Sequence, residues 1–494
     1  MSSAAPARSS EPQARALRYE RHRPGQTLLY RIIAQHYPAF VEHMAGRGRP
    51  LPDYVQQEFE SYLKCGCLEN GFLRVRCDTC HAEQLVAFSC KRRGICPSCG
   101  ARRMADTAAL LVDEVLPDEP LRQWVLSVPY ALRFLFASQP AIMGRVLAIV
   151  YRTIATHLIN KAGVSRNTAR TGAVTLIQRF GSALNLNLHF HMLFLDGVYV
   201  EQSTGAVHFR WVKAPTSAEL TELTQRIAQR IGRYLERQGL LQRDAQHSYL
   251  AGERIDEGPM DPLWGHSITW RIAVGPQAGR KVMTLQTLPA DDPAQAGAAG
   301  NVGGFSLHAG VAVRANQRNK RERLCRYIAR PALSEQRLSL TAAGEVRYQL
   351  KTPYNNGTTH VVFEPLDFLA KLAALVPRPR VNLTRYHGVF APNSAHRALV
   401  TRAGRGKGRA EAAKAEARTP AEQRSAMTWA KRLKRVFGID IETCTACGGP
   451  MRIIACIEDP TVIKAILAHL AGKARPVHAA RLPPGRAPPA LAFS

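Results

Sequence analysis

Two histidines separated by one residue are the strongest indication of chemistry in this 494-residue chain. His189 and His191 lie in the apolar run 187–195, whose length and composition are typical of a β-strand. Because side chains alternate between the faces of a strand, both imidazoles point the same way and Phe190 points into the core behind them. Two adjacent imidazoles can bind one metal ion. About 0.5 such pairs are expected by chance, so the interpretation depends on the surrounding residues.

A tyrosine in a basic segment supplies a candidate nucleophile. Tyr327 lies in segment 321–331 (RERLCRYIARP), which favours a helix that Pro331 ends. Arg323 and Arg330 fall on nearly the same helix face as Tyr327 and could hold a phosphate there. A phenol can attack a phosphodiester and remain linked to it as a phosphotyrosine. A basic tyrosine helix and a two-histidine metal site are together what metal-assisted DNA nicking requires.

Two imidazoles leave coordination positions open for phosphate and water, which suits Mg²⁺ or Mn²⁺. Such an ion would polarise a phosphate oxygen. A third protein ligand is then expected. Gln178 ends the preceding strand candidate and ranks first, before His308 and Asp196. The alternative is that both histidines are ordinary sheet residues and that the tyrosine is one of fourteen without a special role.

The cysteines form a second pattern that favours a metal. Three CxxC pairs are present, against about 0.24 expected by chance. Cys77 and Cys80 precede Cys96 and Cys99 with fifteen residues between the pairs, which is typical of a four-thiolate structural zinc site. Two arginines follow directly and are predicted to contact a phosphate backbone: Arg102 and Arg103.

The remaining cysteines leave alternatives open. Cys65, Cys67 and Cys90 either belong to a second site or fill small apolar gaps. Cys444 and Cys447 form half of a zinc ribbon or bind no metal. Possible further ligands for that pair are Cys456, His469 and His478.

The charge of the chain indicates a polyanionic partner. Lys and Arg number 67 and Asp and Glu 38, which gives a net charge of +29. Nucleic acid is the leading candidate for such a basic protein. No stretch reaches the roughly 20 apolar residues of a membrane helix, and the N-terminal 26 residues contain no signal-peptide core. We therefore expect a cytoplasmic protein with no membrane partner.

The chain is expected to divide into several segments. They are a basic mobile N-terminus (1–26), a helix with a zinc-binding domain (27–110), a catalytic domain (115–400), a linker (401–425), a small basic CxxC segment (426–480) and a disordered tail (481–494). Periodicity predicts helices at 28–44, 103–115, 141–159, 217–238 and 365–375. It predicts strands at 122–129, 173–180, 187–195, 305–313, 345–350 and 360–363. Thr216 and Glu219 form a capping box before the fourth helix.

Several of these motifs occur together in one known family. They are FSCK at 88–91, CPSC at 96–99 followed by RRM, LNLHFH at 186–191, LCRYIARP at 324–331, LVPRPR at 375–380 and RYHGV at 385–389. In this combination the chain resembles rolling-circle insertion-sequence transposases of the His-hydrophobe-His (HUH) tyrosine type. The likeness is to the single-tyrosine ISCR branch, which carries an N-terminal zinc-binding transposase domain, and it covers roughly residues 60–400.

This resemblance implies both a fold and a reaction. The fold is α+β, with a ferredoxin-like antiparallel sheet of the HUH endonuclease type, histidines on a middle strand, a tyrosine on a facing helix and a small N-terminal zinc-binding domain. The reaction is nicking of single-stranded or melted DNA at the element ends through a 5′-phosphotyrosine at Tyr327, followed by transfer to target DNA. The expected DNA contacts of the tyrosine helix are Arg323, Arg326 and Arg330.

The sequence departs from the two-tyrosine members of this family. Those members place their tyrosines four residues apart, whereas Arg323 and Pro331 occupy the positions four residues either side of Tyr327. A second subunit, water or reuse of Tyr327 would have to complete the cycle. Alternatives are a plasmid or phage replication initiator, a relaxase, or a non-catalytic zinc-dependent DNA-binding regulator. A regulator gives no reason for the histidine pair and Tyr327 to occur together.

Overall fold

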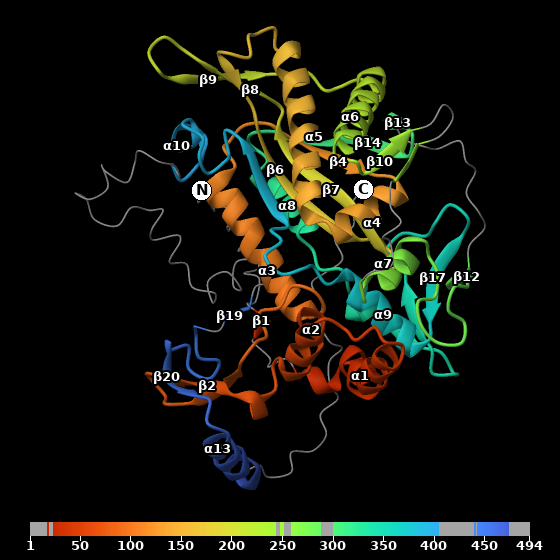
Figure 1. Cartoon of the computed structure of the whole chain (residues 1–494). Coiled ribbons are helices and arrows are strands. Elements are labelled where there is room, and N and C mark those ends of the chain that lie inside the picture. Colours follow the sequence, from red (N-terminus) through yellow and green to blue (C-terminus); the bar gives the residue numbers. More distant parts are fainter. Residues whose placement is uncertain are drawn as a thin grey trace, which may run out of the picture. The chain divides into compact units, whose positions relative to one another are not determined.

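A six-stranded sheet holds the histidine strand in its interior. In the computed structural model the strand order is β13-β14-β4-β7-β6-β18, and every neighbouring pair is antiparallel (Figure 1). The histidine strand is β7 (Leu186–Leu195), which lies between β4 (Leu121–Ser127) and β6 (Gly172–Phe180). The outer strands are β13 (Gly300–Val302), β14 (Phe305–Val313) and β18 (Thr384–Gly388).

The structure describes residues 17–18, 23–243, 248–250, 258–287, 300–404, 439–440 and 442–473. The chain forms two compact units, which we describe separately. The first contains 1–22, 66–88 and 424–494, and the second contains 23–65 and 89–423. Most of the predicted mobile N-terminus, the linker beyond 404, residues 426–438 of the predicted CxxC segment and the tail lie outside the described residues.

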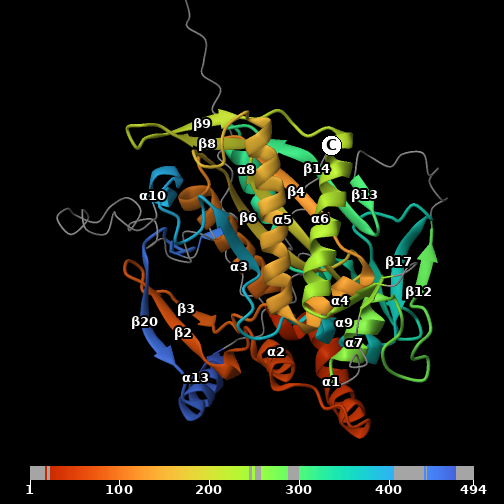
Figure 2. The same ribbon diagram turned by 45° about the horizontal axis from the view of Figure 1, so that its top comes forward.

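Two long helices cover one face of the six-stranded sheet in the second unit (Figures 1 and 2). They are α5 (Pro140–Lys161) and α6 (Ser217–Arg237), which contact each other. Their apolar residues share one core with Trp124 and Phe190 of the sheet. Burial of this apolar area is the main force that holds helices to a sheet.

The opposite sheet face is covered by α3 (Pro97–Leu110) and α8 (Arg318–Ile328). Ala108, Leu324 and Ile328 of these helices pack on sheet residues such as Val174 and Leu193. This is the face to which the two histidines point. The tyrosine helix therefore lies directly over the histidine strand.

Further elements complete the second unit. A four-stranded sheet has the order β12-β17-β16-β15, and a three-stranded sheet has the order β5-β8-β9. Their bounds are β12 (Met283–Gln286), β17 (Thr358–Phe363), β16 (Val346–Gln349), β15 (Leu338–Leu340), β5 (Ala169–Arg170), β8 (Gly197–Glu201) and β9 (Val207–Trp211). A short pair joins β10 (Leu241–Arg243) and β11 (Ser248–Leu250). The remaining helices are α1 (Leu28–Gly46), α2 (Asp53–Lys64), α4 (Tyr130–Ser138), α7 (Asp261–Ile268), α9 (Pro365–Leu375) and α10 (Arg397–Val400).

The first unit joins segments from near both ends of the chain. Strand β2 (Phe72–Cys77) pairs on one side with β3 (Glu83–Ala87) and on the other with β20 (Met451–Ile457). Helix α13 (Pro460–Lys473) packs on this sheet through Ile463. A short parallel pair of β1 (Leu17–Arg18) and β19 (Ile439–Asp440) also lies here. The predicted segment 27–110 is thus divided, because residues 66–88 pair with C-terminal residues.

Most predicted elements within the described residues are confirmed. The helix at 217–237 begins with the predicted capping box of Thr216 and Glu219. The helix predicted at 103–115 begins earlier, at Pro97, because the Cys96 sulfur accepts the amide of Cys99 and caps its first turn. That helix ends in a π-helical turn at Leu111–Val115.

One described helix is long and apolar enough to cross a membrane. It is α5, and half of its apolar window is buried inside the protein. Ten of its residues are buried and eight of these belong to the apolar core on the sheet, as in the central helix of many globular domains. Its length and composition therefore reflect its place in the core.

Candidate active site

The two histidines lie side by side on β7. The ring centroids of His189 and His191 are 4.9 Å apart. Phe190 points to the other face, where its ring lies 6.1 Å from that of Phe136. The structure shows the predicted alternation, and it follows from the two-residue repeat of a strand.

The tyrosine of α8 faces this pair. The ring centroids of Tyr327 and His191 are 6.1 Å apart, with the two planes at 85°. The Arg330 guanidinium lies 4.2 Å from the centre of the Tyr327 ring, and the Lys351 ammonium lies 4.9 Å from it. Cations close to a phenol favour a nearby phosphate. The fold thus brings His189, His191 and Tyr327 together with the positive charges of two further side chains, Arg330 and Lys351.

The hydrogen bond of His189 leaves its outer nitrogen available for a metal. Its Nδ1 lies 2.9 Å from the carbonyl oxygen of Asn187. A carbonyl oxygen only accepts, so Nδ1 carries the proton and Nε2 keeps its lone pair. Metal-binding histidines commonly donate the other ring N–H to a carbonyl in this way.

His191 is held by an amide and has an unpaired nitrogen. The Gln123 side-chain nitrogen lies 2.6 Å from His191 Nδ1, and Nε2 is buried without a hydrogen-bond partner among the described residues. Rotation of the Gln123 side-chain amide by half a turn places its oxygen, instead of its nitrogen, next to His191 Nδ1. The oxygen then accepts a proton from Nδ1, and the Nε2 lone pair is free for an ion. Gln123 was not predicted from the sequence, because nothing distinguishes it from other strand residues.

Gln178 links the histidine strand to the tyrosine helix. It lies directly opposite His189 on β6 and is 4% exposed. Its side-chain nitrogen donates to the carbonyl oxygen of Ile328 at 2.7 Å, and within the described part of the chain its Oε1 is buried without a hydrogen-bond partner. This bond fixes the amide orientation and leaves Oε1 as an acceptor beside the histidines. An unpaired buried oxygen and an unpaired imidazole nitrogen fit a divalent ion.

The other two candidates for the third ligand are engaged elsewhere. Asp196 accepts two hydrogen bonds from the buried guanidinium of Arg122, at 2.9 and 2.8 Å. His308 is exposed on β14, and its Nε2 lies 3.0 Å from Ser306 Oγ. Gln178 is therefore the candidate that the geometry favours.

Burial keeps both imidazoles neutral. It lowers the pKa of His189 to about 4, and the Arg330 charge acts in the same direction while the Asn187 carbonyl opposes it. Burial, with the neighbouring His189, lowers the pKa of His191 to about 2. A neutral imidazole is the form that binds metals. Both rings are thus in the metal-binding form at neutral pH.

The predicted DNA-contacting arginines have different surroundings. Arg330 lies on Tyr327, whereas Arg326 forms an ion pair with Glu322 at 2.6 Å. Arg323 is exposed on α8. Near the cysteines, Arg102 donates to Ser89 Oγ and Arg103 to the carbonyl oxygen of Lys91, each at 3.0 Å. These last two bonds hold the loop that carries Cys90.

The four cysteines predicted as one zinc site are divided between two clusters. In each cluster the four sulfur atoms lie within 4.8 Å of one another. The clusters consist of Cys65, Cys90, Cys96 and Cys99 in the second unit, and of Cys77, Cys80, Cys444 and Cys447 in the first. The prediction is corrected accordingly: each CxxC pair combines with cysteines outside the predicted set, because spacing does not determine which pairs meet.

Both clusters have the geometry of a tetrahedral thiolate site. Sulfur separations in the second-unit cluster are 3.5 Å for Cys90–Cys99 and 3.7 Å for Cys65–Cys99 and Cys65–Cys96. Zn–S bonds of about 2.3 Å require separations of about 3.8 Å. Backbone amides also donate to these sulfurs, such as Cys90 to Cys65 at 3.3 Å. Such bonds stabilise thiolates, so both clusters fit structural zinc.

The first-unit cluster depends on residues far apart in the sequence. Its sulfurs are 3.5 Å apart for Cys77–Cys447 and 3.6 Å for Cys80–Cys444. Backbone amides of Cys80 and Thr79 lower the pKa of Cys77 to about 6. A Cβ on Gly449 would lie 2.3 Å from Thr79 Oγ1, so glycine permits this close approach. The Cys444 pair thus finds its missing ligands in the N-terminal region.

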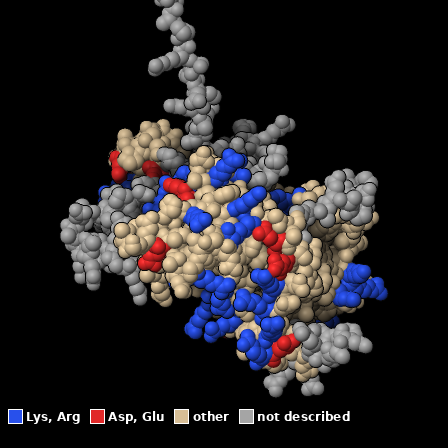
Figure 3. Space-filling model, turned by 90° about the horizontal axis from the view of Figure 1, so that it is seen from above, with Lys and Arg blue, Asp and Glu red and all other residues tan. Residues whose placement is uncertain are grey.

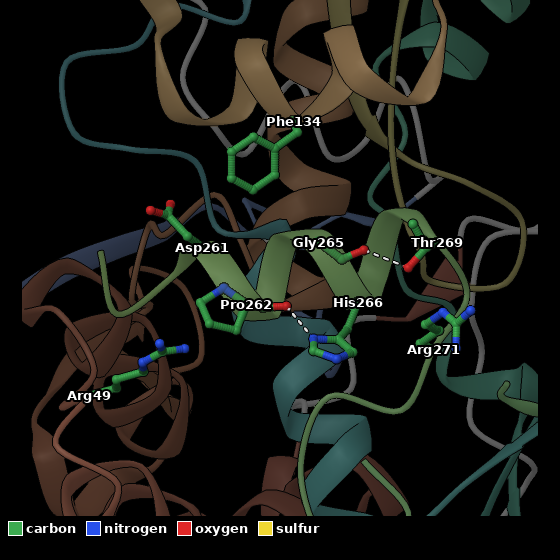
Figure 4. A pocket seen from close by; sticks show the side chains of 8 residues that line it. All are labelled: Arg49, Phe134, Asp261, Pro262, Gly265, His266, Thr269 and Arg271. Carbon is green, nitrogen blue, oxygen red and sulfur yellow. Dashed lines mark hydrogen bonds between the residues drawn. The ribbon is translucent and has the colours of Figure 1, made fainter. Parts of the chain in front are cut away.

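Two other surface features complete the description. Lys and Arg form larger patches than Asp and Glu on the face shown in Figure 3. A separate pocket lies along α7, with Arg49, Asp261 and His266 among its lining residues (Figure 4). His266 Nδ1 lies 2.7 Å from the Pro262 carbonyl oxygen, within the same helix. This pocket contains none of the predicted site residues.

Comparisons with known protein families agree with these features. Residues 172–398 match a family model described as "Putative transposase". Residues 32–128 match a model described as "Transposase zinc-binding domain", of the IS91 type. The comparisons with curated proteins and with solved structures find no match. The two family matches and the cysteine clusters support the assignment of the chain to the IS91-type transposases, which are DNA-processing enzymes.

Proposed function

We propose that this transposase nicks one DNA strand at the ends of its element, with Tyr327 as the nucleophile. The observation that carries the proposal is the position of Tyr327 over His191, with Arg330 and Lys351 beside its ring. The expected substrate is single-stranded or locally melted DNA, because the phenol must reach an exposed phosphate. The reaction would take place in the cytoplasm, where a transposase meets DNA.

The order of the elements supports an HUH endonuclease fold. Along the chain the elements β4, α5, β6, β7, α6 and β14 follow a β-α-β-β-α-β pattern. Their strands lie in the order β14-β4-β7-β6, with antiparallel neighbours. This order and pairing are those expected of a ferredoxin-like sheet, and they support the proposal. It would place the histidines on an inner strand, where Gln123 of the neighbouring β4 holds the ring of His191.

The proposed step exchanges one phosphate ester for another. The Tyr327 oxygen bonds to phosphorus while the bond from phosphorus to the 3′ oxygen breaks. The phenol proton passes to water, and the departing oxygen takes up a proton to give a 3′-OH. The product is a 5′-phosphotyrosine, which a 3′-OH of target DNA can attack in the reverse reaction. Arg330 and Lys351 offset the phosphate charge during both steps.

His189, His191 and Gln178 would hold a divalent ion for this step. A bound Mg²⁺ or Mn²⁺ supplies Lewis-acid polarisation of a phosphate oxygen. The three side chains would orient the phosphate toward Tyr327 and leave the remaining coordination positions of the ion open for phosphate and water. Gln178 also contacts the backbone of Ile328, so the ligand and the nucleophile helix are positioned by one side chain.

The test is a nicking assay on single-stranded oligonucleotides that contain the sequences flanking the gene, with Mn²⁺. The native protein should form a covalent adduct that survives denaturing electrophoresis. Tyr327→Phe should bind the same DNA with equal affinity and form no adduct, because only the attacking oxygen is removed. Tyr386→Phe serves as the matched control, since Tyr386 packs on the same apolar cluster as Tyr327. An adduct with Tyr327→Phe would refute the assignment of the nucleophile.

A further inference from the structure

Aromatic side chains gather at the sheet edge next to the histidines. Strands β4 and β6 end at this edge and β7 begins there, because Ser127 pairs with His189 and Phe180 with Leu186. Tyr130 follows β4 by three residues, and Ser182 follows β6 by two. The edge therefore carries the residues that continue both strands past the candidate metal site.

Tyr130 is the most exposed aromatic residue of this edge. It is 56% exposed, although it begins helix α4. The Arg133 guanidinium lies 4.5 Å from its ring centre and is itself held by a 2.9 Å bond from Nε to the Val128 carbonyl oxygen. A cation is thus held against the ring of Tyr130, while more than half of the residue stays exposed to solvent.

The edge is continuous with the nucleophile. The Arg330 guanidinium lies 4.2 Å from the ring centre of Tyr327 and 5.6 Å from that of Phe180, the last residue of β6. On the same edge, Tyr354 Oη lies 3.0 Å from Ser182 Oγ. Burial raises the pKa of Tyr354, and the nearby Tyr130 phenol adds to this effect. Arg330 thus lies against both Tyr327 and Phe180, Arg133 lies against Tyr130, and the edge carries aromatic rings with a cation at each end.

We propose that this edge binds the unpaired bases next to the scissile phosphate, with the open face of Tyr130 as a stacking platform. Aromatic rings beside cations are characteristic of single-stranded nucleic-acid sites, since every base has a π-face and every nucleotide has a phosphate. Paired bases in a duplex cannot stack on a side chain in this manner. The inference rests on the proposed nicking function and names the residue on which the unpaired bases of its substrate stack.

The test uses a fluorescent thymidine 20-mer, with 5-iodouracil at its centre for photocrosslinking. Affinity is measured by anisotropy in about 0.3 M salt, which weakens phosphate contacts relative to stacking. Tyr130→Ala should bind about tenfold more weakly, and Tyr130→Phe should bind as the native protein does. Trp211→Ala is the matched control, because Trp211 is 58% exposed on β9 of a different sheet. Irradiation should crosslink the iodouracil to Tyr130.

The outcomes separate this inference from the nicking proposal. Equal affinity of the native protein and Tyr130→Ala, or an equal loss with Trp211→Ala, would overturn the stacking platform. The stacking platform would also be overturned if Tyr130→Ala bound a duplex of the same length about tenfold more weakly than the native protein binds that duplex. Adduct formation on the flanking sequences is measured in parallel. If the native protein forms no adduct but crosslinks at Tyr130, the nicking proposal fails while the base-binding edge stands.

Discussion

Burial of the two imidazoles keeps them in the neutral form that the proposed metal site requires, and it also has a cost for stability. An exposed histidine titrates near 6.5, whereas burial lowers the pKa of His189 to about 4 and that of His191 to about 2. The folded protein therefore keeps both rings neutral well below neutral pH. The unfolded chain takes up protons that the folded protein does not.

This difference predicts a pH-dependent stability. As the pH falls below about 6.5 the free energy of unfolding should decrease, because the unfolded state binds more protons. At pH 5 the loss should be about 2 kcal/mol per imidazole. Urea unfolding at pH 7 and pH 5, followed by circular dichroism, measures it. Between pH 7 and pH 5, a variant with both His189→Ala and His191→Ala should lose correspondingly less free energy of unfolding. Equal losses in the variant and the native protein would contradict the buried, neutral state of the pair.

The residues of the candidate site were predictable to different degrees. His189, His191 and Tyr327 stood out because of the segments around them, an apolar strand for the histidines and a basic helix for the tyrosine. Gln123 and Lys351 could not be recognised, since their roles depend on neighbours from other strands and loops. A residue that acts by contact with another element leaves no local pattern in the sequence.

At the scale of elements, the position of the tyrosine helix depends on a glycine. Gly100 of α3 faces Pro331, the residue that follows α8 after a short turn. A Cβ at position 100 would lie 2.8 Å from the Pro331 Cβ, closer than carbon atoms approach. The two helices therefore pack at this point because a side chain is absent.

Gly100→Ala should displace the end of α8 and slow adduct formation at Tyr327. It should also lower the unfolding temperature, although alanine favours a helix over glycine by about 1 kcal/mol. Gly144→Ala is the control, because Gly144 lies within α5 with no atom within 4 Å of a Cβ there. That variant should be as stable as the native protein or more so, and equally active. Native activity in both variants would show that the contact does not position the tyrosine.

Elements with a strong local pattern were predicted closely. The apolar stripe and the capping box define α6 almost to the residue. The start of α3 was missed because the cap is a cysteine sulfur, a group that helix propensities do not consider. Residues 241–300 gave no clear pattern, and α7 and β12 were not foreseen there. Their short lengths give too few repeats for periodicity to identify them.

At the scale of the whole chain, the grouping of the cysteines is the feature that the sequence could not specify. The spacing within each CxxC pair is local, but the partner of Cys80 lies 364 residues away at Cys444. These pairs meet because β20 lies along β2, with Met451 opposite Cys77. Such pairing depends on the fold, and several groupings of eleven cysteines satisfy the same spacings.

The first-unit cluster should therefore hold the C-terminal segment with Cys444 and Cys447 to the N-terminal segment with Cys77 and Cys80. The native protein is expected to bind two zinc ions, and the double variant Cys444→Ser and Cys447→Ser only one. Because zinc ligation contributes directly to folding, loss of this ion should release β20 and expose the segment to protease. Metal analysis and limited proteolysis measure both effects. Cys456→Ser is the control, since Cys456 lies on β20 outside both clusters and should retain two ions. Two ions in the double variant would show that the cluster does not require Cys444 and Cys447.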